Sequence, residues 1–192
     1  MLQIISSFDL SMLHAIFAVR NPQILDVFVD ITQLGNVIAV FLVGGVIALI
    51  LTLHQRVAET IGLTVALLGT AAASSFLKDL FARPRPDIMY QAYPETGYAF
   101  PSEHTALATA LCVFVVYLVY RLTRERAGAM GTIAPALAFC LGLIVISGVG
   151  FSRLYLGVHY LSDVVGGAVL GAALAVIGIM IERSLERFNV RQ

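Results

Sequence analysis

Five long stretches of this chain contain no charged residue, and this pattern constrains the fold more than any other feature of the sequence. The stretches are Val37–Leu53, Thr60–Leu77, Thr105–Tyr120, Ala127–Phe151 and Val164–Ile181. A helix needs roughly 20 predominantly apolar residues to cross about 30 Å of hydrocarbon. Each stretch approaches or exceeds that length, and the shorter ones gain residues from their flanks. The sequence therefore predicts an all-α integral membrane bundle of about five transmembrane helices.

The overall composition agrees with a membrane protein. Hydrophobic residues make up 59% of the 192 residues and charged residues only 12%, whereas soluble domains average about 25% charged residues. The formal net charge is zero, so no nucleic-acid partner is expected. We expect one membrane-embedded domain, 1–192, with an interfacial segment (1–35), a helical bundle (36–181) and a cytoplasmic tail (182–192).

Residues 7–32 have a different, mixed pattern. Apolar residues alternate irregularly with charged ones, and Asn21-Pro22 interrupts the segment. This pattern predicts two short amphipathic helices on the membrane surface. The alternative is a sixth span, which the carboxylates Asp26 and Asp30 disfavour because ionised groups are costly to insert.

Three polar clusters stand at the ends of the apolar stretches. The clusters are Lys78–Pro86, Pro101–His104, and the group Ser152, Arg153, His159 and Asp163. Ionisable residues beside membrane spans are usually kept for a function. These clusters contain cations, two histidines and a carboxylate, which together could hold a phosphate, attack it and protonate a leaving group.

The cations predict an anion site. Arginine offers a planar fork that fits phosphate oxygens, and lysine adds a point charge. We expect Lys78, Arg85 and Arg153 to hold the phosphate. A juxtamembrane patch that touches anionic headgroups is the alternative, and this alternative, or a lesser role in substrate approach, is favoured for Arg83.

The second cluster opens a helix. Ser102 is placed as its N-cap, and the backbone N–H groups of a first turn can receive a phosphate oxygen. His104 lies in that turn and could protonate a departing oxygen. Taken alone, Ser102 would be an ordinary helix cap.

His159 and Asp163 are four residues apart, so a helix would place them on one face. A carboxylate on one imidazole nitrogen fixes the tautomer and frees the other nitrogen to attack. The alternatives are a structural pair at the start of a helix, or metal ligands. Because the neighbouring cations would repel a metal ion, we expect no metal and no cofactor.

Taken together, the clusters resemble the type 2 phosphatidic acid phosphatase superfamily, which includes membrane lipid phosphatases and vanadium haloperoxidases. Its pattern is Lys-x6-Arg-Pro, then Pro-Ser-Gly-His, then Ser-Arg-x5-His-x3-Asp, and the order and spacings hold in this chain. The resemblance implies that His159 is the nucleophile, Asp163 its partner and His104 the general acid. It further implies a metal-independent reaction through a phosphohistidine intermediate, with phosphate held by Lys78, Arg85, Ser102, Glu103 and Arg153.

Glu103 departs from the pattern, because it replaces the family's glycine. Its backbone N–H remains available, but its carboxylate should weaken the binding of a dianion unless it points away. Family branches with an acid here look like undecaprenyl diphosphate phosphatases, so that lipid is the first substrate expected. Phosphatidylglycerol phosphate, phosphatidic acid and lipid A phosphates are alternatives. Other classes are a non-catalytic lipid-phosphate binder, a transporter or a haloperoxidase, all less consistent with the residues.

The distribution of basic residues predicts the orientation. Arginines concentrate in the loops at Arg56 and Arg121–Arg126 and in the C-terminal tail, which are therefore expected to be cytoplasmic. The three clusters then face the periplasm or cell exterior of a bacterial plasma membrane. Gly167 and Gly171 predict close helix packing, either inside the bundle or between subunits of a homo-oligomer.

Overall fold

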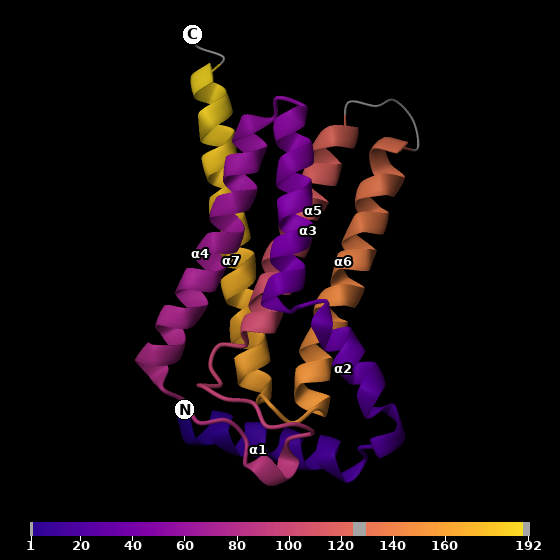
Figure 1. The fold of residues 1–192 in the computed structure, drawn as a ribbon, viewed down its shortest axis with the longest axis vertical. Coiled ribbons are helices and arrows are strands. Elements are labelled where there is room, and N and C mark those ends of the chain that lie inside the picture. The colour runs from indigo at the N-terminus through magenta and orange to yellow at the C-terminus, as the bar shows by residue number, and fades with distance from the viewer. Residues whose placement is uncertain (1, 125–129, 190–192) are drawn as a thin grey trace.

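The computed structural model describes residues 2–124 and 130–189, and its regular elements in these ranges are helices. In chain order they are α1 (Leu2–Ala18), η1 (Pro22–Ile24), α2 (Leu25–Gln33), α3 (Val37–Leu53), α4 (Val57–Phe81), η2 (Ile88–Tyr90), α5 (Glu103–Thr123), α6 (Met130–Tyr155) and α7 (Leu161–Asn189). Figure 1 shows α3 to α7 as an upright bundle with α1 across one end. Residues 127–129 of the predicted fourth span and 190–192 of the predicted tail lie outside the described residues.

The predicted five-span, all-α architecture is confirmed. The described residues contain five helical segments that are long and apolar enough to cross a membrane: Pro22–Leu53, Val57–Phe81, Glu103–Thr123, Gly131–Tyr155 and Leu161–Phe188. Large apolar side chains cover the outside of the bundle, as a lipid environment requires. Leu42, Ile144 and Val169, for example, are 66%, 66% and 64% exposed.

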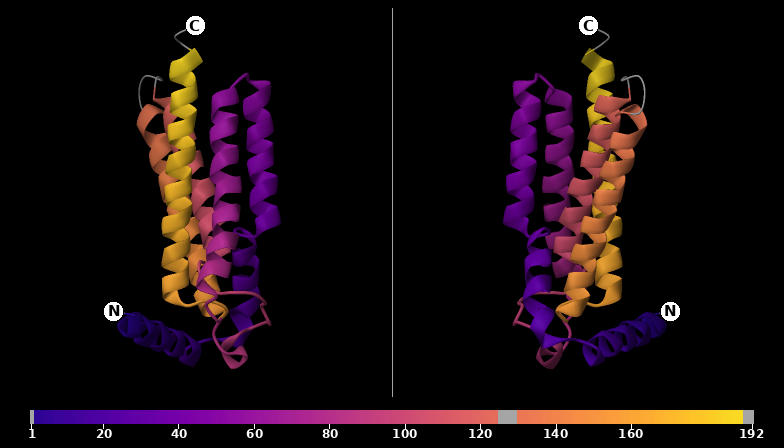
Figure 2. Two further views of the ribbon diagram at one scale, coloured as in Figure 1. Left: turned by 90° about the vertical axis from the view of Figure 1, so that its left-hand side faces the viewer. Right: turned by 90° about the vertical axis from the view of Figure 1, so that its right-hand side faces the viewer.

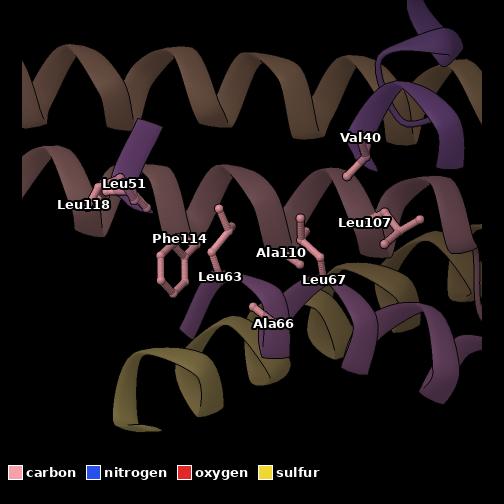
Figure 3. Packing of buried hydrophobic residues seen from close by; sticks show 9 residues of the cluster. All are labelled: Val40, Leu51, Leu63, Ala66, Leu67, Leu107, Ala110, Phe114 and Leu118. Atoms are coloured by element: carbon pink, nitrogen blue, oxygen red, sulfur yellow. The ribbon is translucent and has the colours of Figure 1, made fainter. Parts of the chain in front are cut away.

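The main cluster of buried apolar side chains lies between α3, α4 and α5. α7 packs along both α4 and α5, and α5 also packs against α6. Phe114 of α5 is fully buried beside Leu63 of α4 (Figure 3). The rest of this cluster comes from α3, α4 and α5: Val40, Leu51, Ala66, Leu67, Leu107, Ala110 and Leu118.

Gly167 and Gly171 belong to the interface between α7 and α5. A Cβ added to Gly171 would lie 2.1 Å from the carbonyl oxygen of Ala106, and one added to Gly167 would lie 2.4 Å from that of Ser102. Only glycine, which has no Cβ, allows the backbones of α5 and α7 to come this close. The glycine face is therefore used inside the bundle, and the expectation that it could join two subunits is wrong because the face is already covered by α5.

The two N-terminal helices take different positions. α1 lies across the end of the bundle, as expected of a surface helix (Figure 2). α2 packs along α6, where the Phe28 ring stacks on Tyr155 with a centroid separation of 4.0 Å. The first apolar segment joins α2 to α3 as Pro22–Leu53, so the described residues hold no sixth span.

Candidate active site

The three polar clusters meet at the end of the bundle that α1 covers. Lys78 lies in the last turn of α4, and Ser102–His104 open α5. Arg153 lies in the last turn of α6, and Asp163 in the first turn of α7. The backbone N–H of Ser102 donates to the carbonyl of Asp163 at 3.0 Å, so the starts of α5 and α7 are tied together. The structure thus brings all the predicted site residues to one end.

His159 is held in a defined tautomer. Nη1 of Arg85 lies 3.1 Å from Nε2 of His159. Because a guanidinium can only donate, Nε2 is the acceptor and carries a lone pair. The proton is then on Nδ1, which faces Oδ2 of Asp163 at 3.5 Å. That separation is too long and too poorly aligned for a hydrogen bond, and Nδ1 is left without a hydrogen-bond partner, as is common for catalytic pairs before substrate binds.

The His159 imidazole is neutral. Its side chain is 2% exposed, and burial, followed by the charges of Arg153 and Arg85, lowers the pKa of His159 well below its ordinary value. Asp163 is held from the other side, because its Oδ2 accepts the backbone N–H of Tyr160 at 2.9 Å. A neutral imidazole with a directed lone pair is the form that can act as a nucleophile.

Glu95 forms ion pairs with Arg85 and Arg153, two of the cations that were predicted to hold phosphate. Its Oε1 lies 3.3 Å from Nη2 of Arg85, and its Oε2 accepts from Nη2 of Arg153. Burial alone would raise the pKa of Glu95, but Arg153 and Arg85 outweigh it, so the pKa is lowered and the group is ionised. The carboxylate therefore makes contacts of the kind that a phosphate makes with two arginines.

Both arginines are fixed in place by other contacts. Nη1 of Arg85 donates to the carbonyl of Val158 at 3.0 Å. Nη1 of Arg153, whose side chain is 1% exposed, donates to Tyr93 Oη at 2.9 Å and to Thr32 Oγ1 at 3.2 Å. The two guanidinium groups are consequently pre-positioned, which lowers the entropy lost on binding an anion.

Glu103 points toward the site. Its Oε2 lies 2.9 Å from Nζ of Lys78. Lys78, Arg85 and Arg153 therefore face two carboxylates, Glu95 and Glu103, and one positive charge among the five is uncompensated. A phosphate dianion entering this site must displace or outcompete at least one carboxylate.

His104 and Ser102 have clear but different surroundings. The half-buried His104 lies in the first turn of α5, within electrostatic range of Arg153, Glu95, Lys78 and Arg85. Ser102 is the N-cap of α5 and fully buried, but its side chain makes no capping bond to the backbone. Its Oγ instead pairs with Thr105 Oγ1 at 3.0 Å.

Arg83, expected to touch lipid headgroups or to aid substrate approach, instead contacts the candidate site residue Asp163. Its Nη1 donates to Oδ1 of Asp163 and to Oγ of Ser162, both at 2.6 Å. Its Nη2 donates to Oδ2 of Asp9 at 2.7 Å. Arg83 thus bridges a residue of the surface helix and the partner of His159.

Sequence reasoning did not find Glu95 or Asp9. Glu95 lies in a polar loop with no motif, and Asp9 lies in an irregular amphipathic helix. A carboxylate flanked by Phe8 and Leu10 is a weak signal by itself, and the arginine it pairs with is 74 positions away. In the described residues, the acidic group with metal-ligand spacing is Glu59, Glu182 and Glu186 at the opposite end, where Arg121 contacts all three.

Known proteins resemble this chain in sequence and in fold. Phosphatidylglycerophosphatase B of Bacillus subtilis is 28% identical over 186 residues, covering 96% of this chain and 88% of that protein. Lipid A 4'-phosphatase of Bacteroides thetaiotaomicron is 29% identical over 185 residues, covering 89% and 75%. The crystal structure of a transmembrane PAP2 type phosphatidylglycerolphosphate phosphatase from Bacillus subtilis has the same fold, with a TM-score of 0.83 at 24% identity over 96% of this chain and 89% of that chain.

The family assignment rests on the region that carries the site. The sequence profile of the PAP2 superfamily matches residues 59–185, more than half of the chain. All three polar clusters lie within this range. The chain therefore belongs to the PAP2 superfamily and is a membrane-embedded lipid phosphatase.

Proposed function

We propose that this protein hydrolyses the terminal phosphate of a lipid phosphate or diphosphate through a phosphohistidine at Nε2 of His159. The observation that carries the proposal is the contact between Arg85 and that nitrogen at 3.1 Å. The contact identifies Nε2 as the nitrogen with the lone pair and places it beside an arginine that would hold the phosphate. The Arg85 N–H turns from Nε2 to a phosphoryl oxygen as substrate binds, which frees the lone pair to attack phosphorus. A group that both presents the nucleophile and binds the electrophile gives the orientation that phosphoryl transfer needs.

In the first step, Nε2 of His159 attacks phosphorus and the bond from phosphorus to the lipid oxygen breaks. Arg85, Arg153 and Lys78 take the phosphoryl oxygens in place of Glu95 and Glu103. Asp163 faces the Nδ1 proton and stabilises the positive charge that forms on the imidazole. His104, in its protonated form, gives its proton to the departing oxygen.

In the second step, water replaces the lipid. His104 is now neutral and accepts a proton from the water as it attacks phosphorus. The bond between phosphorus and Nε2 breaks, inorganic phosphate leaves, and His159 returns to its neutral form. The backbone N–H groups of Glu103 and His104, in the first turn of α5, would add hydrogen bonds to the phosphoryl oxygens.

Two substrates are the first to test. Undecaprenyl diphosphate is favoured by Glu103, because family branches with an acid at this usual glycine position look like undecaprenyl diphosphate phosphatases. Phosphatidylglycerol phosphate is favoured by similarity to a relative named for it. Phosphatidic acid and lipid A phosphates share the same reacting group and belong in the same assay.

The site would face the periplasm or exterior of a bacterial membrane. The opposite end carries most of the arginines outside the site, as expected of a cytoplasmic face. The described ones are Arg56, Arg121, Arg124, Arg183 and Arg187. Single cysteines at the exposed positions Asp87 and Gln55, in a chain lacking Cys112 and Cys140, test this orientation. A reagent that does not cross membranes should label position 87 alone in intact cells, and labelling of position 55 alone would reverse the orientation.

Phosphate release by the purified protein in detergent tests the function. The four lipids are assayed in parallel with EDTA present, and His159→Ala is the control. Release from a lipid by the wild type, lost in the variant and unaffected by EDTA, is the expected result. Binding of a lipid without release would favour a non-catalytic binder, with Glu103 as the residue to replace next.

A further inference from the structure

Asp9 is a buried carboxylate on an otherwise exposed stretch of helix. It is 2% exposed, while its neighbours Phe8 and Leu10 are 56% and 44% exposed. Both carboxylate oxygens are paired: Oδ1 accepts the backbone N–H of Ser162 at 2.9 Å, and Oδ2 accepts from Ser162 Oγ at 2.6 Å and Arg83 Nη2 at 2.7 Å. Burying a charge is unfavourable unless it is paired in this way, so Asp9 has a specific position.

The contacts of Asp9 lead to His159 through two intervening residues, Arg83 and Asp163. The guanidinium of Arg83 lies between two carboxylates, with Nη2 on Asp9 and Nη1 on Oδ1 of Asp163. It also stacks over the Tyr160 ring at 4.5 Å from the centroid. Oδ2 of the same Asp163 faces Nδ1 of His159. Asp9, Arg83, Asp163 and His159 thus form a connected row of alternating groups.

Asp9 also caps the helix that carries Asp163. The first N–H groups of a helix have no partner within it, and Asp9 accepts the one from Ser162 in the first turn of α7. Burial by itself would raise the pKa of Asp9, but the bonds from Ser162 and Arg83 outweigh it and lower that pKa. Asp9 is therefore ionised in its position.

We propose that Asp9 is a positioning residue for phosphoryl transfer, acting through Arg83 and Ser162 to hold Asp163 toward His159. This inference rests on the proposed role of His159 as the nucleophile. Without the Asp9 charge, Arg83 no longer pairs with two carboxylates and forms an ion pair with Asp163 alone. Asp163 is then drawn toward Arg83 and stabilises the charged phosphohistidine less well, so the chemical step slows while the phosphate contacts stay intact.

The test is Asp9→Asn in the full chain, assayed on the lipid that the wild type hydrolyses. Residues that orient a reacting group's partner typically matter by about tenfold to a hundredfold, so kcat should fall by about that factor per folded molecule. KM and the inhibition constant of inorganic phosphate should stay within about twofold. Asp9→Glu should recover part of kcat. Asp26→Asn and Asp30→Asn remove the same charge from exposed positions of α2 and should leave kcat unchanged.

A double-mutant cycle with Arg83→Lys checks the route of the effect. If Asp9 acts through Arg83, the kcat losses of the two single variants should not multiply in the double variant. Either substitution alone already disrupts the contact between Asp9 and Arg83, so the second adds little. Multiplying losses would overturn the proposal. Should Asp9→Asn fail to fold, Asp9→Glu and Ser162→Ala decide the question, with a kcat loss at unchanged KM expected for each.

A purely structural role gives a different result. In that case Asp9→Asn would lower the thermal midpoint and the folded fraction, but kcat per folded molecule would equal that of the wild type, and the proposal would be wrong. Failure of the proposed function is separate: it would appear as a wild type that releases no phosphate, or as His159→Ala retaining activity.

Discussion

Arg85 lies 3.1 Å from the Nε2 atom of His159, so the arginine proposed to bind phosphate contacts the proposed nucleophile. The guanidinium keeps the imidazole neutral at that nitrogen and leaves Nδ1–H toward Asp163. The same arginine lies 3.3 Å from Glu95. The other oxygen of Glu95 accepts from Arg153, so one carboxylate bridges the two arginines and offsets their mutual repulsion.

The buried His159 predicts a pH-dependent loss of stability. Its pKa is lowered by burial first and then by Arg153 and Arg85, whereas in the unfolded chain it returns to about 6.5. The unfolded state thus binds the proton first, and stability should fall as the pH drops below about 6.5. The slope for this one group is at most about 1.4 kcal/mol per pH unit.

Thermal unfolding in detergent between pH 7 and pH 5 measures this effect. The wild type should lose more stability over that range than His159→Gln, which has no group to protonate there. Asp9 and Glu95 have lowered pKa values and titrate at lower pH, so they contribute little to the comparison. Equal slopes for the two proteins would show that His159 is not buried in its neutral form.

Glu95→Gln should strengthen the binding of phosphate. The amide oxygen can accept from only one of Arg85 and Arg153, and the amide no longer carries the charge that competes with a phosphoryl group. We expect inorganic phosphate to inhibit the variant at concentrations about tenfold lower, since one charge-assisted contact contributes roughly 1.5–3 kcal/mol. Asp79→Asn removes an exposed charge from the end of α4 and serves as the matched control. Weaker phosphate inhibition in Glu95→Gln would mean that Glu95 orients the arginines rather than competing for them.

Glu103→Gly should change substrate preference more than it lowers the rate. The change frees Lys78, which now pairs with Glu103 at 2.9 Å, and restores the family's usual residue. Because Glu103 is the feature that favours undecaprenyl diphosphate, its loss should move the preference toward phosphatidylglycerol phosphate. Relative kcat/KM values for phosphatidylglycerol phosphate and undecaprenyl diphosphate measure the shift. Complete loss of activity would refute this account, because it would make the carboxylate essential.

Gly171→Ala should destabilise the bundle. The new Cβ would lie 2.1 Å from the carbonyl oxygen of Ala106, so α5 and α7 would have to separate. Forcing extra volume into a packed interface costs about 1–3 kcal/mol. Gly45→Ala in α3 is the matched control, because its Cβ would meet nothing within 4 Å and alanine favours a helix. Thermal midpoints in the same detergent compare the two, and an unchanged midpoint for Gly171→Ala would contradict the close packing.

The sequence alone determined the spans and the main site residues. The charge-free stretch Val37–Leu53 coincides with α3, because apolar length and local hydrogen bonding are sufficient to specify a membrane helix. Lys78, Arg85, His104, His159 and Asp163 were identified by fixed spacings within short segments. Such spacings depend on the geometry of a helix end, which is determined by the local sequence.

Only the tertiary structure decided which charges meet. Glu95 reaches Arg153 58 positions away, and Asp9 reaches Ser162 153 positions away. The packing of Gly171 against Ala106, which closed the glycine face to a second subunit, is likewise a contact between distant segments. From the sequence of each segment one can infer that a buried charge needs a partner. Which residue is that partner depends on how the helices pack in three dimensions.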